Sequence, residues 1–319
     1  MKHVNRSMAL GVLSLAMTAQ AMAAPAMAGS DCQPSKWGAD DEVGNANLID
    51  AASVLKAAEL IKTGQTYSLG ITIDSATPAF PPRGLSLTVV QPNQQDGAEP
   101  LFGYTYNDDI FTGWLGIGSQ LDGLGHFGTD HEYYNCNRAA DFSAITGLTR
   151  LGIEKVPPIV ARGIVLDMAA HHGVDHLAAG QAFSVEDVQA VEKRQGTPVR
   201  EGDVVLFHTG WTDAKLDAEP ALWASTAPGS SAAVAEYLAG RNVVAVGSDT
   251  WGLDVVPAEH PEKPFPGHVT LLQKHGIYIL ETMNTGPLVR DGAYEFLFVL
   301  GQAKVRGAVQ MIINPVAIR

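Results

Sequence analysis

The chain has 319 residues, with 21 Lys and Arg against 34 Asp and Glu, so its formal net charge at pH 7 is -13. Such an acidic surface repels phosphate groups, and no Lys/Arg cluster offsets it, which excludes nucleic acid and anionic membranes as expected partners. The length is sufficient to bury a large hydrophobic core, as one big domain or as two closely joined ones.

The beginning of the chain predicts a secretory signal peptide over residues 1–28. Lys2 and Arg6 precede an apolar run over residues 8–23, and small residues follow the pattern Ala-x-Ala at 21–23 and 26–28. The run is shorter than the ~18 apolar residues of a membrane helix, although an N-terminal anchor is the alternative. Cleavage would leave 19 basic and 34 acidic residues, a charge of -15. We expect a periplasmic or secreted protein, with residues 29–319 forming a single domain.

The chain contains two cysteines, Cys32 and Cys136. In an oxidising compartment they could pair and tether the N-terminal segment, or they could be two unrelated cysteines. Two cysteines are too few for a typical cysteine-based zinc site.

The first predicted elements are a helix, a strand and a variable region. Residues 50–62 place alanines and apolar side chains at helical spacing and stop before Gly64, which predicts a helix. Polar and apolar side chains alternate enough over residues 67–73 to predict a strand. Residues 75–101 are rich in Pro, Gly and Gln, apart from the apolar run 85–90, and predict a hairpin or a loop beside the functional site.

The stretch 116–126 (GIGSQLDGLGH) is the most informative part of the sequence. Four glycines in eleven residues argue against a regular helix, so we expect a glycine-rich loop with inward-pointing polar groups. Asp122 offers a metal-binding carboxylate and His126 a base for the proton of a water molecule. This combination is typical of a hydrolytic metal site.

The second half of the chain predicts alternating strands and helices. Short apolar, β-branched runs predict strands at 163–168, 203–208, 242–247, 276–280, 295–300 and 308–313. Helices are predicted at 184–194, 230–238 and 268–274, the first of them with Ser184 as N-cap and Asp187 in its first turn. The order indicates an α/β fold with a mixed β-sheet or barrel-like core flanked by helices.

A second polar cluster lies far along the chain, at His268 and Glu281. Glu281 ends a strongly apolar strand, where a charge is unusual unless something binds it. If Asp122 meets these two side chains, the nitrogen and oxygen donors would suit one zinc or manganese ion. An equally weighted alternative pairs Glu281 with an arginine and makes His268 a helix cap.

These motifs resemble the cyclase-like metal-dependent hydrolase family, which includes bacterial kynurenine formamidase and isatin hydrolase. The resemblance extends from Trp37 and Gly38 to near the C-terminus, and it implies a swivelling β/β/α fold. That family carries the pattern His-x-Gly-Thr-His-x-Asp-x-Pro-x-His, followed by a later His and Glu. The resemblance implies that Asp122, His268 and Glu281 are metal ligands and that His126 is the catalytic proton donor and acceptor.

The chain departs from the family pattern at two positions. Gly116 and Gln120 stand where the family has its first two histidines, both of which bind metal in the two-metal members. The resemblance therefore implies a divergent branch that keeps one metal ion, with Gln120 as a fourth ligand or a substrate contact. His126 could also bind the metal directly.

The function that follows is metal-dependent hydrolysis of a C–N amide bond, in an arylformamide or a cyclic amide. Phe80, Phe102, Tyr104 and Trp114 could form a wall for an aromatic substrate, although each could equally be core. A homodimer or higher homo-oligomer is a family-level expectation.

Three other interpretations need weighing. Ser119 lacks the G-x-S-x-G elbow of a serine hydrolase. His171, His172 and His176 form a second group that we interpret as a solvated loop, and His208 either caps a strand or lines the pocket. A non-catalytic periplasmic small-molecule-binding protein on the same fold is the alternative function, which the loss of the two histidines favours.

Overall fold

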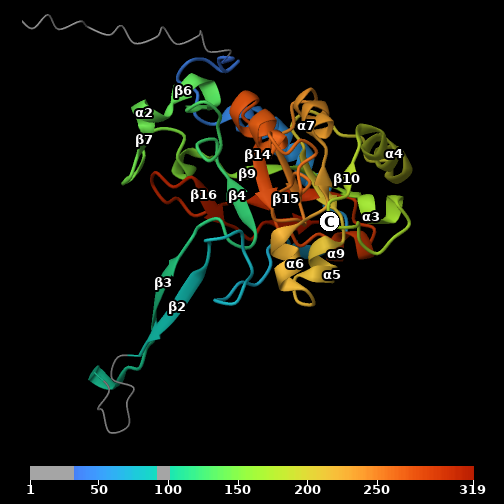
Figure 1. Ribbon diagram of the computed structural model, residues 1–319. Coiled ribbons are helices and arrows are strands. Elements are labelled where there is room, and N and C mark those ends of the chain that lie inside the picture. Colours follow the sequence, from blue (N-terminus) through green and yellow to red (C-terminus); the bar gives the residue numbers. More distant parts are fainter. Residues whose placement is uncertain (1–31, 92–100) are drawn as a thin grey trace, which may run out of the picture. The chain divides into compact units, whose positions relative to one another are not determined.

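A nine-stranded mixed sheet lies at the centre of the computed structural model, which describes residues 32–91 and 101–319 (Figure 1). In sheet order its strands are β1 (Thr66–Ser68), β17 (Val316–Ile318), β15 (Glu295–Leu300), β9 (Ile159–Asp167), β11 (Val204–His208), β13 (Ala245–Ser248), β14 (Tyr278–Glu281), β4 (Gln120–Asp122) and β16 (Gln310–Ile312). Strands β9, β11, β13 and β14 are parallel, and the flanking strands pair antiparallel. The predicted α/β fold with a mixed, barrel-like core is thus confirmed.

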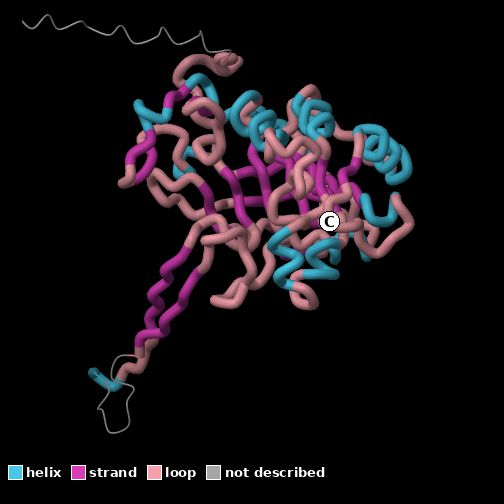
Figure 2. The backbone as a smooth tube through the Cα atoms, viewed as in Figure 1, coloured by secondary structure: helices cyan, strands magenta, loops and turns pink. Residues whose placement is uncertain are grey.

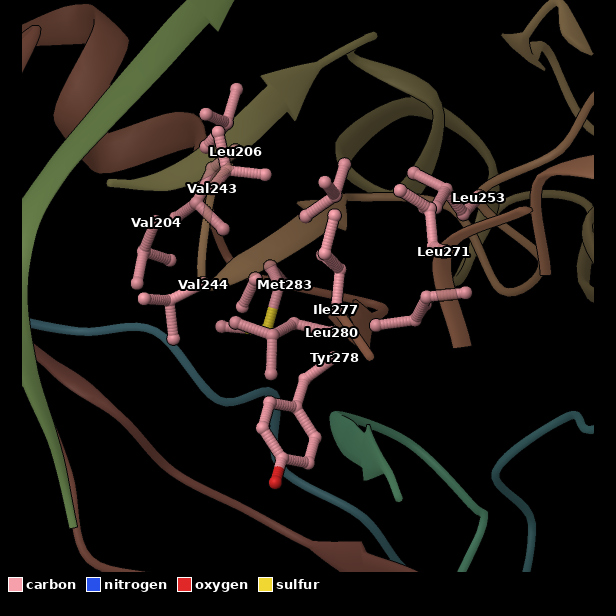
Figure 3. Close-up of a cluster of buried hydrophobic side chains, with 14 of the residues drawn as sticks. Val204, Leu206, Val243, Val244, Leu253, Leu271, Ile277, Tyr278, Leu280 and Met283 are labelled. Atoms are coloured by element: carbon pink, nitrogen blue, oxygen red, sulfur yellow. The ribbon is translucent and has the colours of Figure 1, made fainter. Parts of the chain in front are cut away.

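The parallel strands are hydrophobic because both of their faces are covered. Every residue of β11, β13 and β14 is buried, which is the pattern expected for strands inside an α/β sheet. Figure 3 shows part of this core, where Leu206, Tyr278 and Met283 pack in one cluster. All six strands predicted in the second half of the chain belong to the sheet, with ends shifted by a few residues.

Short helices cover the sheet. They are α1 (Ala51–Ala58), α2 (Ala139–Phe142), α3 (Met168–His171), α4 (Val185–Gln195), α5 (Trp211–Lys215), α6 (Pro220–Ser225), α7 (Ala232–Ala239), α8 (Pro266–His268) and α9 (Gly286–Arg290). The 3-10 turns are η1 (Gly44–Leu48), η2 (Leu101–Gly103), η3 (Tyr134–Cys136) and η4 (Ile153–Lys155), and η5 (Val269–Lys274) is a π-helical turn. Helices α4 and α7 lie on one side of the sheet, and α5, α6 and α9 on the other (Figures 1 and 2).

The predicted start of α4 is confirmed in detail. Ser184 accepts a hydrogen bond from the backbone N–H of Asp187, and the Asp187 carboxylate accepts one from the N–H of Ser184. This capping box satisfies two amide groups that the helix itself leaves without partners. Gly196 then ends the helix in the left-handed conformation, at φ 70°.

Two early elements are shorter than predicted, and the residues that follow them bond to distant parts of the chain. The helix predicted over 50–62 ends at Ala58, and the N–H groups of Thr63 and Gly64 donate instead to the carbonyl of Arg319. The strand predicted over 67–73 ends at Ser68, since later N–H groups bond to Pro315 and to side chains.

Three other predicted boundaries need correction. Ser230 belongs to a short strand, so the helix predicted over 230–238 begins at Ala232. The helix predicted over 268–274 is a π-helical turn that follows α8. The glycine-rich stretch 116–126 contains the buried strand β4 and is therefore not a loop throughout. For Ser230 and for strand β4, pairing with a distant segment overrides the local pattern.

Four two-stranded ribbons complete the fold. They are β2 (Leu85–Val90) with β3 (Asp108–Gly113), β5 (Glu132–Tyr133) with β6 (Asn137–Arg138), β7 (Ser143–Ala144) with β8 (Gly147–Leu148), and β10 (Ala182–Phe183) with β12 (Gly229–Ser230). The β2–β3 hairpin extends away from the sheet (Figure 1) and falls in the region predicted as a hairpin or a loop. Of that region, residues 92–100 lie outside the described residues, as does the predicted signal peptide.

Cys32 and Cys136, which are 104 positions apart in sequence, form a disulfide bond with their Cα atoms 5.6 Å apart. The bond ties the first described residue to turn η3, and it resolves the pairing that the sequence left open. Within residues 32–91 and 101–319, no helix is both long and apolar enough to cross a membrane.

Candidate metal centre

Strand β4 brings four polar side chains to one place on the sheet. Gln120 and Asp122 are two residues apart and therefore project from the same face of β4. Glu281 of β14 lies directly opposite Gln120, and Gln310 of β16 lies directly opposite Asp122. Directly opposed side chains of antiparallel strands are close neighbours. Three short strand segments therefore assemble a compact polar cluster in the middle of the fold.

His268 reaches this cluster from the end of α8. Asp254 accepts hydrogen bonds from the backbone N–H of Gly267 at 2.7 Å and of His268 at 3.3 Å. The same carboxylate lies 2.8 Å from Nδ1 of the His268 ring. A proton on Nδ1 that is donated to Asp254 leaves Nε2 with a free lone pair toward the cluster. Asp254 thus holds His268 in the orientation that a metal ligand would require.

Asp122, His268 and Glu281 converge as the predicted ligands must. Each offers one ligand atom, and these atoms lie within 4.8 Å of one another. Nε2 of His268 is 3.3 Å from Oε1 of Glu281 and 3.7 Å from Oδ2 of Asp122. All three side chains are buried, and Oδ2 of Asp122 has no hydrogen-bond partner among the described residues. A buried carboxylate oxygen without a donor fits a cation, and the N/O donor set suits zinc or manganese.

The charges of the cluster also favour a cation. Burial and the negative charge of Asp122 raise the pKa of Glu281 to about 7. Burial works against a charged His268, but its contacts with Asp122, Asp254 and Glu281 raise its pKa well above the usual value. Burial would also raise the pKa of Asp122, yet the neighbouring His126, His268 and Gln310 lower it. The carboxylates of Asp122, Asp254 and Glu281 thus favour a positive charge between them, either a proton on His268 or a bound metal ion.

His126 lies at the edge of the cluster, on the turn after β4. Its Nε2 is 4.0 Å from Oδ2 of Asp122, and its side chain is 17% exposed. Burial lowers the pKa of His126; the charge of Asp122 acts against this, and the charges of His268 and Arg83 add smaller contributions that lower it. A neutral imidazole that borders both the cluster and the cavity is able to accept a proton.

Gln120 lies inside the cluster, in the position expected of a fourth ligand or a substrate contact. Its amide donates to Oε2 of Glu281 at 2.5 Å and to Oδ1 of Asp122 at 3.4 Å. In this orientation Gln120 holds the two carboxylates rather than offering its own oxygen.

A cavity of about 160 Å³ opens onto the cluster. It is lined by His126, His268 and Glu281, by Arg83 and Gly252, and by four aromatic side chains, Phe80, Phe127, Trp251 and Phe265. The ring centroids of Phe80 and Trp251 are 5.4 Å apart, and those of Phe127 and Phe265 are 6.4 Å apart. Cavities of about 150 Å³ hold one benzene ring, so this one matches a single-ring aromatic group.

The aromatic wall predicted from the sequence needs correction. Of its members only Phe80 lines this cavity. Phe102 and Tyr104 are 86% and 75% exposed, because they lie in the connection between β2 and β3, which the hairpin carries away from the sheet. Trp114 is half exposed and lines a separate groove at the base of the hairpin. Phe127, Trp251 and Phe265 take the place of these residues, and no local pattern marked them.

Sequence reasoning also missed Asp254, Gln310 and Arg83. Asp254 and Gln310 are each a single polar residue inside an apolar run, which is the same signal that identified Glu281. Arg83 follows two prolines in the variable region, and Nη1 of its guanidinium donates to the carbonyl of Gly116 at 2.8 Å. Only the fold could show that this arginine faces the cluster.

The other side chains weighed from the sequence lie elsewhere. The Ser119 hydroxyl donates to the carbonyl of Thr282 at 2.5 Å, which is a structural contact. His208 ends β11 and lies 2.8 Å from Oγ1 of Thr285. His171 and His172 form a half-exposed group with Asp187, apart from the cavity.

The fold and the donor set together define an α/β protein related to metal-dependent hydrolases. The Cyclase family model matches residues 67–255, which is more than half of the chain. The chain belongs to this family, as the sequence motifs predicted. No match was found among curated proteins.

Solved structures agree with this assignment. A novel cyclase superposes with a TM-score of 0.81 and 29% identity, over 89% of this chain and 98% of that one. Isatin hydrolase A from Labrenzia aggregata, bound to benzyl benzoate, superposes with a TM-score of 0.60 and 17% identity, over 79% of this chain and 93% of that one. A protein described as a potential metal-dependent hydrolase with cyclase activity superposes with a TM-score of 0.51 and 17% identity, over 79% of this chain and 98% of that one. At these two lower identities the likeness concerns the fold.

Proposed function

We propose that the protein is a metal-dependent hydrolase that cleaves the C–N bond of a small aromatic amide, either an arylformamide or a cyclic amide. The observation that carries the proposal is the convergence of Asp122, His268 and Glu281, with one oxygen of Asp122 buried and without a partner. The aromatic cavity beside these ligands supports an aromatic substrate. The similarity to isatin hydrolase A supports a cyclic amide as one candidate.

The site residues divide the work of hydrolysis between them. Asp122, His268 and Glu281 would hold one divalent zinc or manganese ion, which when bound polarises a carbonyl group and lowers the pKa of water. His126 takes one proton from the attacking water and returns it to the leaving nitrogen. The water oxygen forms the new C–O bond as the C–N bond breaks, so one amide and one water give a carboxylic acid and an amine.

Arg83 gives the cavity a fixed positive charge. Among the described residues no carboxylate lies within ion-pair distance of its guanidinium, and its charge lowers the pKa of nearby His126. A guanidinium pairs well with a carboxylate or a developing oxyanion. We therefore assign Arg83 to a carboxylate of the substrate or to the oxyanion that develops as the amide is attacked.

Metal analysis and hydrolysis assays test the proposal together. Purified protein should contain zinc or manganese, and it should hydrolyse N-formylkynurenine, related anilides or isatin until a chelator removes the metal. Metal-free protein that binds aromatic amides without cleaving them would favour the alternative function, a non-catalytic periplasmic small-molecule-binding protein.

We also propose a periplasmic or secreted location and a homo-oligomeric state. The Cys32–Cys136 disulfide supports an oxidising compartment. The β2–β3 hairpin supports self-association, because Leu87, Ile110 and Phe111 expose about half of their surface or more. Sedimentation of the intact protein, and cell fractionation of its host, test these two points.

A further inference from the structure

The two oxygens of Asp122 are in different states. Oδ1 accepts a hydrogen bond from the amide of Gln310 at 2.7 Å and a longer one from Gln120 at 3.4 Å. Oδ2, which faces His268, has no hydrogen-bond partner among the described residues. A carboxylate with both oxygens free could bridge two cations, whereas Asp122 has only one oxygen left for a cation.

Gln310 places its amide nitrogen between a carboxylate and an imidazole. The nitrogen is 2.7 Å from Oδ1 of Asp122 and 3.4 Å from Nε2 of His126. Gln310 is buried and lies directly opposite Asp122 in the sheet register. A carboxylate and an imidazole on either side of one point are a common pair of zinc ligands. Here an uncharged N–H donor occupies that point.

Gly116 makes room for this arrangement. A Cβ atom at position 116 would lie 2.4 Å from Oε1, 2.6 Å from Cδ and 2.7 Å from Nε2 of Gln310. The φ angle of Gly116 is not in the left-handed region, so its backbone would accept an L-residue. The obstacle to any side chain at 116 is therefore the Gln310 amide itself.

We propose that Gln310 occupies the place of a second cation, so that the centre holds one ion and His126 stays outside the coordination sphere. The inference rests on the proposed metal centre. Gly116 and Gln310 form an interdependent pair, because the missing side chain of one allows the amide of the other to reach Asp122. A His126 without a metal keeps the lone pair that proton transfer requires.

Zinc titration calorimetry, with elemental analysis of the dialysed protein, tests this proposal. All variants carry His171→Ala, so that the exposed histidine group contributes no zinc. The His171→Ala protein, which is the parent of the other variants, should bind one zinc ion. Gln310→Glu replaces the donor with a carboxylate of the same shape and should add a second ion, and His126→Ala in that background should remove it again.

Gly116→Ala gives a second test with an intact Gln310. The added methyl pushes the amide off Asp122, so a second zinc ion should bind, more weakly than in Gln310→Glu. The matched control is Gly301→Ala, since a Cβ at Gly301 meets nothing within 4 Å, and this variant should bind one ion.

The outcomes separate the two proposals. Binding of a single zinc ion by both Gln310→Glu and Gly116→Ala overturns the inference, as does binding of two ions by the parent. A parent that binds neither zinc nor manganese overturns the inference and the proposed function together. A parent that binds one zinc ion but hydrolyses no amide overturns the proposed function alone.

Discussion

The protein contains two groups in which histidine and carboxylate side chains come close enough to bind a metal ion, and they differ in almost every other respect. Asp122, His268 and Glu281 are all buried, whereas His171, His172 and Asp187 are exposed or half exposed. The buried group draws its members from β4, α8 and β14, which are distant in sequence. The exposed group comes from the end of α3 and the first turn of the nearby α4.

The contacts of the carboxylates explain the difference. Both oxygens of Asp187 are already engaged, one by the backbone N–H of Ser184 and the other by His171 at 3.1 Å. Asp187 therefore has a structural role in capping α4. Oδ2 of Asp122 has no such role among the described residues. Proximity of donors is common on protein surfaces, and a buried donor without a partner is the more specific sign of a ligand site.

Matched amide substitutions of the two aspartates should give the largest contrast. Asp122→Asn removes the negative charge at the buried centre and should lower kcat/KM for amide hydrolysis by about 10³-fold or more, with loss of the bound metal. Asp187→Asn should leave both activity and metal content unchanged. Parallel assays and elemental analysis of the two folded variants check this. Equal losses in both variants would show that burial does not distinguish the two groups.

Asp254 tests whether the orientation of His268 matters to the buried group. Asp254→Asn keeps the shape of the side chain but weakens the hold on Nδ1, so zinc affinity should fall by about 10- to 100-fold. A calorimetric titration measures the change. The exposed group lacks a buried orienting carboxylate among the described residues. An unchanged zinc affinity in Asp254→Asn would contradict the role given to this contact.

Substitution of Arg83 tests whether the cavity beside the buried group recognises a carboxylate of the substrate. Arg83→Met keeps much of the apolar stem and removes the charge, so KM for substrates with a carboxylate should rise by about 10-fold or more. Metal content should stay unchanged, because Arg83 belongs to the cavity and not to the ligands. Steady-state assays with an acidic anilide and its neutral ester compare the two cases. An equal effect on both substrates would argue against carboxylate recognition.

The pH dependence of zinc binding should also differ between the groups. The pKa of Glu281 is raised to about 7 and that of His268 lies well above its usual value, so both must lose a proton to bind zinc. Affinity at the buried group should therefore fall as pH drops through about 7, by about tenfold per unit for each proton displaced. The pKa of Asp187 is lowered, so this carboxyl group adds no such dependence near neutral pH. Titrations of His171→Ala protein at several pH values measure the dependence of the buried group alone, and a zinc affinity that stays constant below pH 7 would contradict the prediction.

Much of the fold follows from local patterns. The buried parallel strands consist largely of apolar residues, and the prediction of these strands is confirmed. Ser184 and Asp187 indicate the start of α4 in the sequence, and this prediction is confirmed as well. Strand β4 was not predicted, because its three residues lie among glycines and owe their pairing to β14 and β16. Helix α1 likewise ends earlier than predicted, at Ala58, and the following N–H groups of Thr63 and Gly64 bond to the C-terminal residue Arg319.

The site was predictable where a polar residue interrupts an apolar run. Glu281 was found in this way, and Asp254 and Gln310 carried the same signal without being recognised. The cavity wall was not predictable, since an exposed Phe102 and a cavity-lining Phe265 look alike in sequence. Only the packing of distant segments decides which aromatic side chains meet the substrate.

The central claim is that Asp122, His268 and Glu281 hold one catalytic ion together. Anomalous diffraction at the zinc absorption edge, from crystals of the zinc-loaded protein, tests it most directly. The account predicts one strong anomalous peak about 2 Å from Oδ2 of Asp122, Nε2 of His268 and a carboxylate oxygen of Glu281. A peak confined to His171, His172 and Asp187, with none at the buried group, would contradict it.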